Sequence, residues 1–277
     1  MKNTNYKNWH RQHAKVWEIM PSPARPSLGE VSIFQKYLDS LRVEKEGKIK
    51  VLILGSTPEF RDLCNKERYE VACIDINQPI YQALTLLQKK PNLKERYICD
   101  NWLTFKDKRK YDIILGDAVT AMFPLGLYTQ FFKNMNRHLT KNGLLVIRVP
   151  YQDNKFKVPM KRVMKNYRNI YKSKGVHIYT ATYNFLVMNY LNKEKSSVTL
   201  SLLGQKIKDL YEHEILTKKE YDELRLYYKS LTLELSYPKE DFLRFTATKS
   251  LEYLAKEFSL DYLTSLSNPI FVFKKRN

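Results

Sequence analysis

The sequence has 277 residues, of which 43% are hydrophobic and 28% are charged. This balance is typical of a globular protein and excludes a mainly disordered one. The formal net charge is +19. A positive surplus of that size attracts anions such as nucleic acid. The codon bias of an AT-rich genome, which raises the lysine content, would produce the same surplus without any function.

Three further features of the composition bear on location. No run of 18 apolar residues occurs, so we expect no membrane-spanning helix. The polar start of the chain predicts no signal peptide. The three cysteines, Cys64, Cys73 and Cys99, have neither a disulfide pattern nor a zinc spacing. Together these features favour the reducing environment of the cytoplasm.

The chain begins with a predicted helical cap over residues 1–45. Trp9 and Trp17 belong to a set of apolar residues at helical spacing, which ends at a proline-rich break. Ser27 and Glu30 form a capping box, in which each residue bonds to the backbone of the other, and this predicts the start of a second helix.

Residues 46–150 alternate between predicted strands and helices. Lys48–Gly55 is a run of leucine and β-branched residues that ends at glycine, as expected for a strand buried on both faces. Helices are expected over Pro79–Lys90 and Leu125–Leu139. Four more strands are expected, over Tyr69–Asp75, Arg96–Asp100, Tyr111–Asp117 and Leu144–Val149. The alternation predicts a parallel sheet covered by helices on both faces.

Residues 151–238 form a predicted helical insertion after the fifth strand. Thr217 and Glu220 supply a second capping box there. Residues 239–277 are expected to return to the core, with one helix and two strands over Glu240–Phe258, Leu260–Leu266 and Ile270–Phe273.

The residues that end the strands are the candidate binding residues, because ligands of open parallel sheets lie beyond the carboxyl ends of the strands. Gly55–Glu59 makes a turn with outward-facing N–H groups. Asp75 ends the second strand, at a place where a carboxylate accepts both ribose hydroxyls of an adenosine cofactor. Asp100–Trp102 and Asp117 end the next two strands. A single aspartate there is more often a turn former, but the four sites together favour a binding function.

Five segments, taken in this order, resemble the class I S-adenosylmethionine-dependent methyltransferases: VLILGSTPEF, CID, CDNW, YDIILGDAV and NGLLVIRVP. The resemblance is strongest to a little-characterised bacterial branch of the class, whose first motif is Leu-Gly-x-Thr-Pro-Glu. It implies an α/β fold with a Rossmann-like, doubly wound, seven-stranded sheet whose last strand is antiparallel. The N-terminal cap and the insertion after the fifth strand would be additions to this core.

The resemblance also implies S-adenosyl-L-methionine as cofactor and assigns residues to its parts. Most of the class has an acidic residue two positions before the first glycine, where this chain has Ile53, and Glu59 is expected to supply that carboxylate toward the methionine ammonium. The other assignments are Gly55, Ser56 and Thr57 at the methionine part, Asp75 at the ribose, Asp100, Asn101 and Trp102 at the adenine, and Asp117 between the methionine end and the acceptor.

Methyl transfer is an in-line displacement that needs an aligned acceptor, and it needs a base only if the acceptor must lose a proton. Asp117, His177 and Tyr179 are the catalytic candidates, although a surface or core-edge position explains a histidine such as His177 more often than catalysis does. No cluster of histidine, cysteine and carboxylate has a metal spacing, so no metal is expected.

Two acceptor classes remain open from the sequence. A cap that carries Trp9 and Trp17 predicts an enclosed pocket for a small or medium-sized acceptor. Residues 155–174 carry eight Lys and Arg residues and no acidic one, which suits an anionic acceptor such as RNA, or is simply a solvated helix face. A non-catalytic cofactor-binding module is the third hypothesis.

Overall fold

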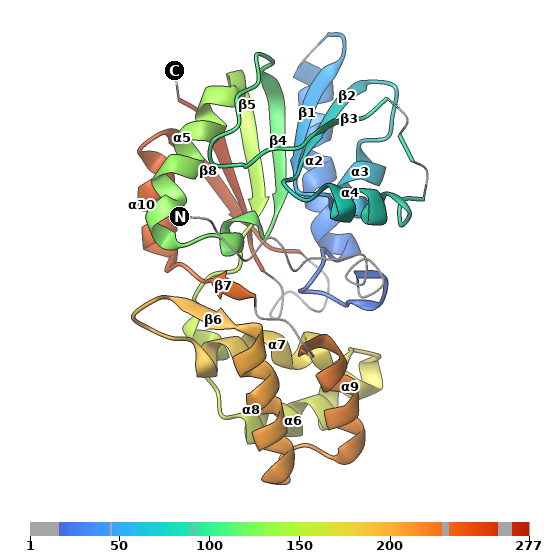
Figure 1. Cartoon of the computed structure of the whole chain (residues 1–277), viewed down its shortest axis with the longest axis vertical. Coiled ribbons are helices and arrows are strands. Elements are labelled where there is room, and N and C mark those ends of the chain that lie inside the picture. The colour runs from blue at the N-terminus through green and yellow to red at the C-terminus, as the bar shows by residue number, and fades with distance from the viewer. Residues whose placement is uncertain are drawn as a thin grey trace.

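The computed structural model describes residues 17–44, 46–89, 91–92, 94–228, 233–259 and 268–276. An α/β core is joined to a lobe made mainly of helices, which is the lower part of Figure 1. Trp9 lies outside the described residues, and so does the whole of the strand expected over Leu260–Leu266.

A seven-stranded sheet forms the core, in the order β3-β2-β1-β4-β5-β9-β8. β1 to β5 are parallel to one another, and β9 runs antiparallel to both β5 and β8. The strand order reverses between β1 and β4, so their carboxyl ends flank the expected ligand crevice. The strands are β1 (Ile49–Leu54), β2 (Tyr69–Ile74), β3 (Arg96–Ile98), β4 (Tyr111–Asp117), β5 (Leu139–Arg148), β8 (Leu251–Glu257) and β9 (Ile270–Lys275).

Alternate residues of the central strands face opposite helical layers, as the period of a strand requires. Leu52 and Leu54 of β1 pack in the same cluster as Phe131 of α5 (Tyr128–His138) and Leu243 of α10 (Glu240–Thr248). Val51 and Ile53 belong to the other cluster, with residues of α2 (Leu28–Glu44) and α3 (Pro58–Leu63). Both faces of the sheet are therefore covered, which confirms the predicted Rossmann-like class.

The capping box at the start of α2 forms as predicted and also reaches the core. Ser27 Oγ accepts the Glu30 N–H at 3.2 Å, and Glu30 Oε2 accepts the Ser27 N–H at 2.7 Å. The other oxygen, Oε1, accepts from Arg148 Nη1 at 3.2 Å. Arg148 Nε donates to Asp117 Oδ1 at 2.6 Å. These three side chains are at most 3% exposed, so one guanidinium holds two carboxylates inside the protein.

One predicted element is wrong. The helix expected over Glu240–Phe258 ends at Thr248, and Leu251–Glu257 forms the edge strand β8. The segment is rich in Leu, Ala, Glu and Lys, which favour a helix locally. Pairing with β9 outweighs this preference, since the seven-residue strand bonds along its length to the last strand.

The helical lobe has its own apolar core and includes a small sheet that the sequence reading did not predict. Its helices are α6 (Met160–Asn166), α7 (Ile178–Tyr190), α8 (Leu200–Glu212) and α9 (Lys218–Tyr228). β6 (Ser197–Thr199), between α7 and α8, pairs antiparallel with β7 (Glu234–Ser236), which lies just before the chain returns to the core. Thr217 and Glu220 form the predicted capping box at the start of α9.

Two shorter helical segments differ in length from the prediction. α4 spans Gln78–Thr85, and Asn77 caps its start by accepting the N–H of Ile80 at 3.1 Å. A 3₁₀ turn, Leu125–Leu127, precedes α5. None of the helices among the described residues is both long enough and apolar enough to cross a membrane.

We predict that Arg148→Met destabilises the fold strongly, because the substitution leaves the Glu30 and Asp117 carboxylates buried without a cation. Breaking a buried ion pair from one side costs about 3–5 kcal/mol, and urea unfolding measures this loss. Lys36→Met is the matched control, since the Lys36 side chain is 64% exposed beside Glu257 and such a pair contributes about 0–1 kcal/mol. Equal losses in the two variants would contradict the structural role of Arg148.

Candidate functional site

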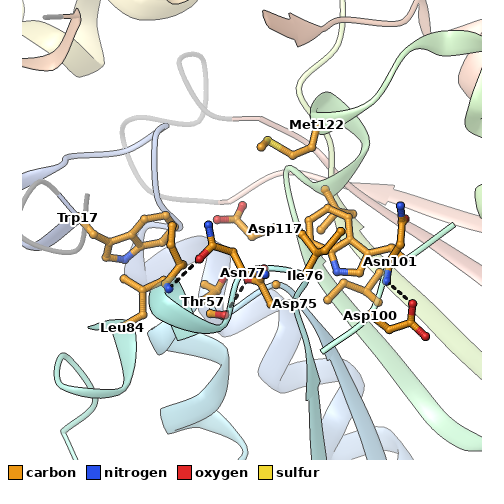
Figure 2. A pocket seen from close by; sticks show the side chains of 16 residues that line it. Trp17, Thr57, Asp75, Ile76, Asn77, Leu84, Asp100, Asn101, Asp117 and Met122 are labelled. Carbon is orange, nitrogen blue, oxygen red and sulfur yellow. Dashed lines mark hydrogen bonds between the residues drawn. The ribbon is translucent and has the colours of Figure 1, made fainter. Parts of the chain in front are cut away.

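A cleft lies at the carboxyl ends of β1, β2 and β4, where the strand order reverses. Figure 2 shows Asp100 and Asn101 toward one end of the cleft, Trp17 and Leu84 at the other, and Asp117 and Met122 between them. The empty space among its lining residues is about 780 Å³, which includes the open mouth toward solvent. Most of the residues predicted for the cofactor line this cleft: Gly55, Ser56, Thr57, Asp75, Asp100, Asn101, Trp102 and Asp117.

The turn after β1 depends on Gly55. Its φ is +86°, in the left-handed region that side chains with a Cβ rarely adopt. Gly55 N–H donates to the Ile74 carbonyl at 2.8 Å, and Trp102 Nε1 donates to the same carbonyl at 2.9 Å. Trp102 therefore lies against the turn, where a Cβ on Gly55 would be 3.7 Å from its ring.

Asp75 is held at the end of β2 by two donors. Ser56 Oγ donates to one carboxylate oxygen at 2.8 Å, and the Asn77 N–H donates to the other at 2.9 Å. Burial raises the pKa of Asp75 above its ordinary value, against the lowering effect of these two hydrogen bonds. Each oxygen keeps a further acceptor position, so the fixed carboxylate can accept two hydroxyl groups from a ligand.

The end of the cleft at Asp100 and Asn101 combines polar and apolar groups. Asp100 Oδ1 accepts the Asn101 N–H at 2.7 Å, and Asn101 Oδ1 accepts the Leu103 N–H at 2.9 Å. The side chains are thus oriented by the local backbone. Ile76 lines the same cleft and is 41% exposed, so it offers an apolar surface to a flat ligand.

Asp117 lies at the centre of the site, and burial raises its pKa while the ion pair with Arg148 acts in the opposite direction. Sequence reading assigned Asp117 to the site but missed Arg148. The available signal was a lone arginine inside the apolar strand segment LLVIRV, because a buried cation of this kind needs a carboxylate partner.

A second contact missed from the sequence joins the N-terminal segment to α3. Arg25 forms an ion pair with Glu59, and Arg25 Nη1 also donates to the Trp17 carbonyl at 3.0 Å. Glu59 does not line the cleft, but its Oε2 is buried without a hydrogen-bond partner among the described residues. Trp17 packs on Ile80 and Leu84 of α4, and its Nε1 is likewise buried and unpartnered there.

A second cavity, which we call the inter-lobe cavity, adjoins the cleft. It lies between the core and the helical lobe, with about 930 Å³ of space between its walls. Trp17, Asp117 and Met122 line both spaces. Its remaining wall is mostly apolar and aromatic, and it includes Tyr179 and Tyr183 of α7.

The three catalytic candidates lie in different places. Asp117 and Tyr179 line the inter-lobe cavity, and His177 lines neither space. His177 caps α7, since its Nδ1 accepts the Tyr179 N–H at 3.1 Å, and its Nε2 lies 3.1 Å from Glu223 Oε1. Burial lowers the pKa of His177, and Glu223 opposes that effect.

Two other sequence expectations can be placed in the structure. Among the described residues, no three His, Cys, Asp or Glu side chains form a group that could hold a metal. None of residues 155–174 lines the cleft or the inter-lobe cavity. Arg168 in this segment pairs with Glu220 of α9 at 2.7 Å, so part of the basic segment has a structural role.

The sequence matches no protein-family model and no curated protein. The fold, by contrast, resembles many solved structures. One is a Rhodobacter sphaeroides protein provisionally described as a Zn-dependent alcohol dehydrogenase (TM-score 0.63, 15% identity, 100% of both chains). Another is an S-adenosylmethionine-dependent methyltransferase from Clostridium acetobutylicum (TM-score 0.57, 11% identity, 96% of this chain and 98% of that one).

A third similar structure carries ligands. It is a Burkholderia thailandensis 1,6-didemethyltoxoflavin-N1-methyltransferase with bound 1,6-didemethyltoxoflavin and S-adenosylhomocysteine (TM-score 0.52, 9% identity, 97% of this chain and 84% of that one). At such identities a likeness shows the fold alone. The chain has the Rossmann-like fold of the S-adenosylmethionine-dependent methyltransferases.

We predict that Gly55→Ala strains the turn after β1. A residue with a Cβ in the left-handed region costs roughly 1–2 kcal/mol, so the free energy of unfolding should fall by about that amount in a urea titration. Gly126→Ala is the control, because a Cβ there meets nothing within 4 Å and the backbone is not left-handed. A Gly55→Ala protein as stable as Gly126→Ala would show that the turn adapts without strain.

Proposed function

We propose that the protein transfers the methyl group of S-adenosyl-L-methionine to a small or medium-sized acceptor. The observation that carries the proposal is that the cleft and the inter-lobe cavity share Trp17, Asp117 and Met122 as lining residues. A cofactor in the cleft would therefore have one end open to the cavity that receives the acceptor.

The residues of the cleft suit the three parts of this cofactor. Asp75 accepts the two ribose hydroxyls, and the adenine lies at Asp100, Asn101 and Trp102, with Ile76 against the ring. The turn at Gly55, Ser56 and Thr57 surrounds the methionine part. We assign the methionine ammonium to Glu59, whose Oε2 is buried and unpartnered although the side chain does not line the cleft, while Arg25 keeps this side chain in place.

The reaction requires positioning more than it requires an acid or a base. The cofactor supplies a methyl group on a positively charged sulfur. With the cofactor bound, an acceptor lone pair would form the new bond to the methyl carbon and the electrons of the carbon–sulfur bond would stay on sulfur. Any proton still on the acceptor atom would be lost to solvent once the methylated product has left the site. Trp17, Asp117 and Met122 surround this junction, and the apolar walls exclude bulk water from it.

Neither Tyr179 nor Asp117 is poised as a base. Burial raises the pKa of Tyr179 well above its ordinary value, so the hydroxyl keeps its proton at neutral pH. Asp117 is engaged by Arg148. We therefore assign Asp117 a positioning role, Tyr179 a place in the acceptor wall and His177 the capping of α7.

The alternatives draw less support. A nucleic-acid acceptor held by residues 155–174 would need that segment beside the cleft, and none of it lines either space. A non-catalytic module has no need of the second cavity.

All three cysteines are unpaired, which agrees with a cytoplasmic enzyme.

We predict that Asp75→Ala weakens binding of S-adenosylmethionine and S-adenosylhomocysteine by about 1–3 kcal/mol, since hydrogen bonds to a charged group are lost. This corresponds to roughly 5- to 150-fold in affinity, measured by calorimetric titration with NAD as a negative control ligand. Glu70→Ala is the matched variant, because Glu70 lies at the other end of β2 and pairs with Arg109. Unchanged affinity in Asp75→Ala would remove Asp75 from the site.

We predict that Glu59→Gln weakens binding of the amino-acid part of the cofactor and leaves binding of the adenosine part unchanged. Losing the carboxylate should weaken S-adenosylhomocysteine by about 1.5–3 kcal/mol, because its ammonium loses a charge-assisted hydrogen bond. Methylthioadenosine has the adenosine and the sulfur but no ammonium, so its affinity should stay constant. Parallel calorimetric titrations of both ligands make the comparison, and an equal loss for both would exclude a specific contact of Glu59 with the ammonium.

A further inference from the structure

Tyrosines from three elements of the helical lobe form one wall of the inter-lobe cavity. Tyr179 is central, with ring centroids 5.1 Å from Tyr183, 4.9 Å from Tyr227 and 5.7 Å from Tyr228. Tyr237, which follows β7, completes the wall. Aromatic faces and edges at these spacings pack well against a further flat ring.

This wall carries no charge. Burial raises the pKa of Tyr179, Tyr228 and Tyr237 well above the ordinary value, and that of Tyr183 above it. Among the described lining residues, Asp117 is the only acidic one, and there is no Lys, Arg or His. Because Arg148 binds the Asp117 carboxylate, the cavity offers neither a cation for an acidic ligand nor a free anion for a basic one.

One polar group of the wall lacks a partner. The Tyr183 and Tyr237 hydroxyls bond to each other at 2.7 Å. The Tyr228 hydroxyl is buried and has no hydrogen-bond partner among the described residues, on a side chain that is only 3% exposed. A buried hydroxyl left unpaired is unfavourable. Because Tyr228 lines the cavity, a ligand that packs against this side chain and reaches its hydroxyl gains by supplying the missing partner.

We propose that the methyl acceptor is a flat, uncharged aromatic compound with a hydroxyl group or ring nitrogen that bonds to the Tyr228 hydroxyl. The inference rests on the proposed function, because it names the acceptor class of the same site. The tyrosine wall contacts the ring system, and Tyr228 fixes its orientation toward the junction at Asp117 and Met122.

The test uses binding of four matched probes to the full chain, with and without S-adenosylhomocysteine, by calorimetric titration. The probes are 2-naphthol, 2-methylnaphthalene, the anion 6-hydroxy-2-naphthoate and the cation 2-naphthylmethylammonium. We expect 2-naphthol to bind at least ten times more tightly than the anion and the cation. Either charged probe binding as tightly as 2-naphthol, or no binding of 2-naphthol at all, would overturn the inference.

Tyr228→Phe tests the hydrogen bond separately from the ring. The variant should lose about 5- to 30-fold in affinity for 2-naphthol, in line with about 1–2 kcal/mol for one hydrogen bond, and none for 2-methylnaphthalene. Tyr221→Phe is the control on the same helix, where Tyr221 stacks on Tyr211 instead of lining the cavity. Equal affinity of 2-naphthol for Tyr228→Phe and the unmodified protein would refute the role of Tyr228.

The same titrations keep the two proposals distinguishable. If S-adenosylhomocysteine fails to bind while 2-naphthol binds through Tyr228, the proposed methyl transfer fails and the cavity still has the inferred ligand chemistry. If S-adenosylhomocysteine binds and the probe order is reversed, the cofactor assignment stands and the acceptor class is wrong.

Discussion

The Arg148 guanidinium, enclosed by the core, connects the parts of the protein that have to meet at the site. It bonds Glu30 at the start of α2 and Asp117 at the end of β4. Because two buried carboxylates repel each other and are costly to desolvate, their positions depend on this one cation. The same side chain therefore fixes the start of α2 and the carboxylate at the centre of the cleft.

The charge of the site differs from the charge of the whole chain. The protein carries +19, yet the ionisable residues lining the cleft are Asp75, Asp100 and Asp117 among those that the structure describes. An acidic cleft suits a ligand with a positive centre, such as a sulfonium. Among the described residues, the Lys and Arg side chains that give the surplus therefore lie outside the cleft. The composition pointed toward nucleic acid because a net charge does not tell where the charges lie.

The sequence predicts the elements whose signals are local. The strands β1, β2 and β4 are mainly apolar runs, and both capping boxes are four-residue patterns, so each can be identified without knowledge of the rest of the chain. Once these strands are identified, the residues at their ends are identified too. Most of the residues predicted for the cofactor line one cleft. β8 was mistaken for a helix because its identity depends on pairing with β9, and no local pattern encodes that contact.

The residues that sequence reading missed are those with distant partners. Arg148 and Glu30 are 118 positions apart, and the tyrosine wall draws on α7, α9 and the segment after β7. The cleft and the inter-lobe cavity consequently differ in how far their lining residues can be predicted from local sequence patterns. Strand ends of the core supply most of the cleft, whereas the inter-lobe cavity depends on how the inserted lobe packs. Changes in the lobe can therefore alter the inter-lobe cavity without disturbing the strand ends that line the cleft, while Trp17, Asp117 and Met122 constrain both.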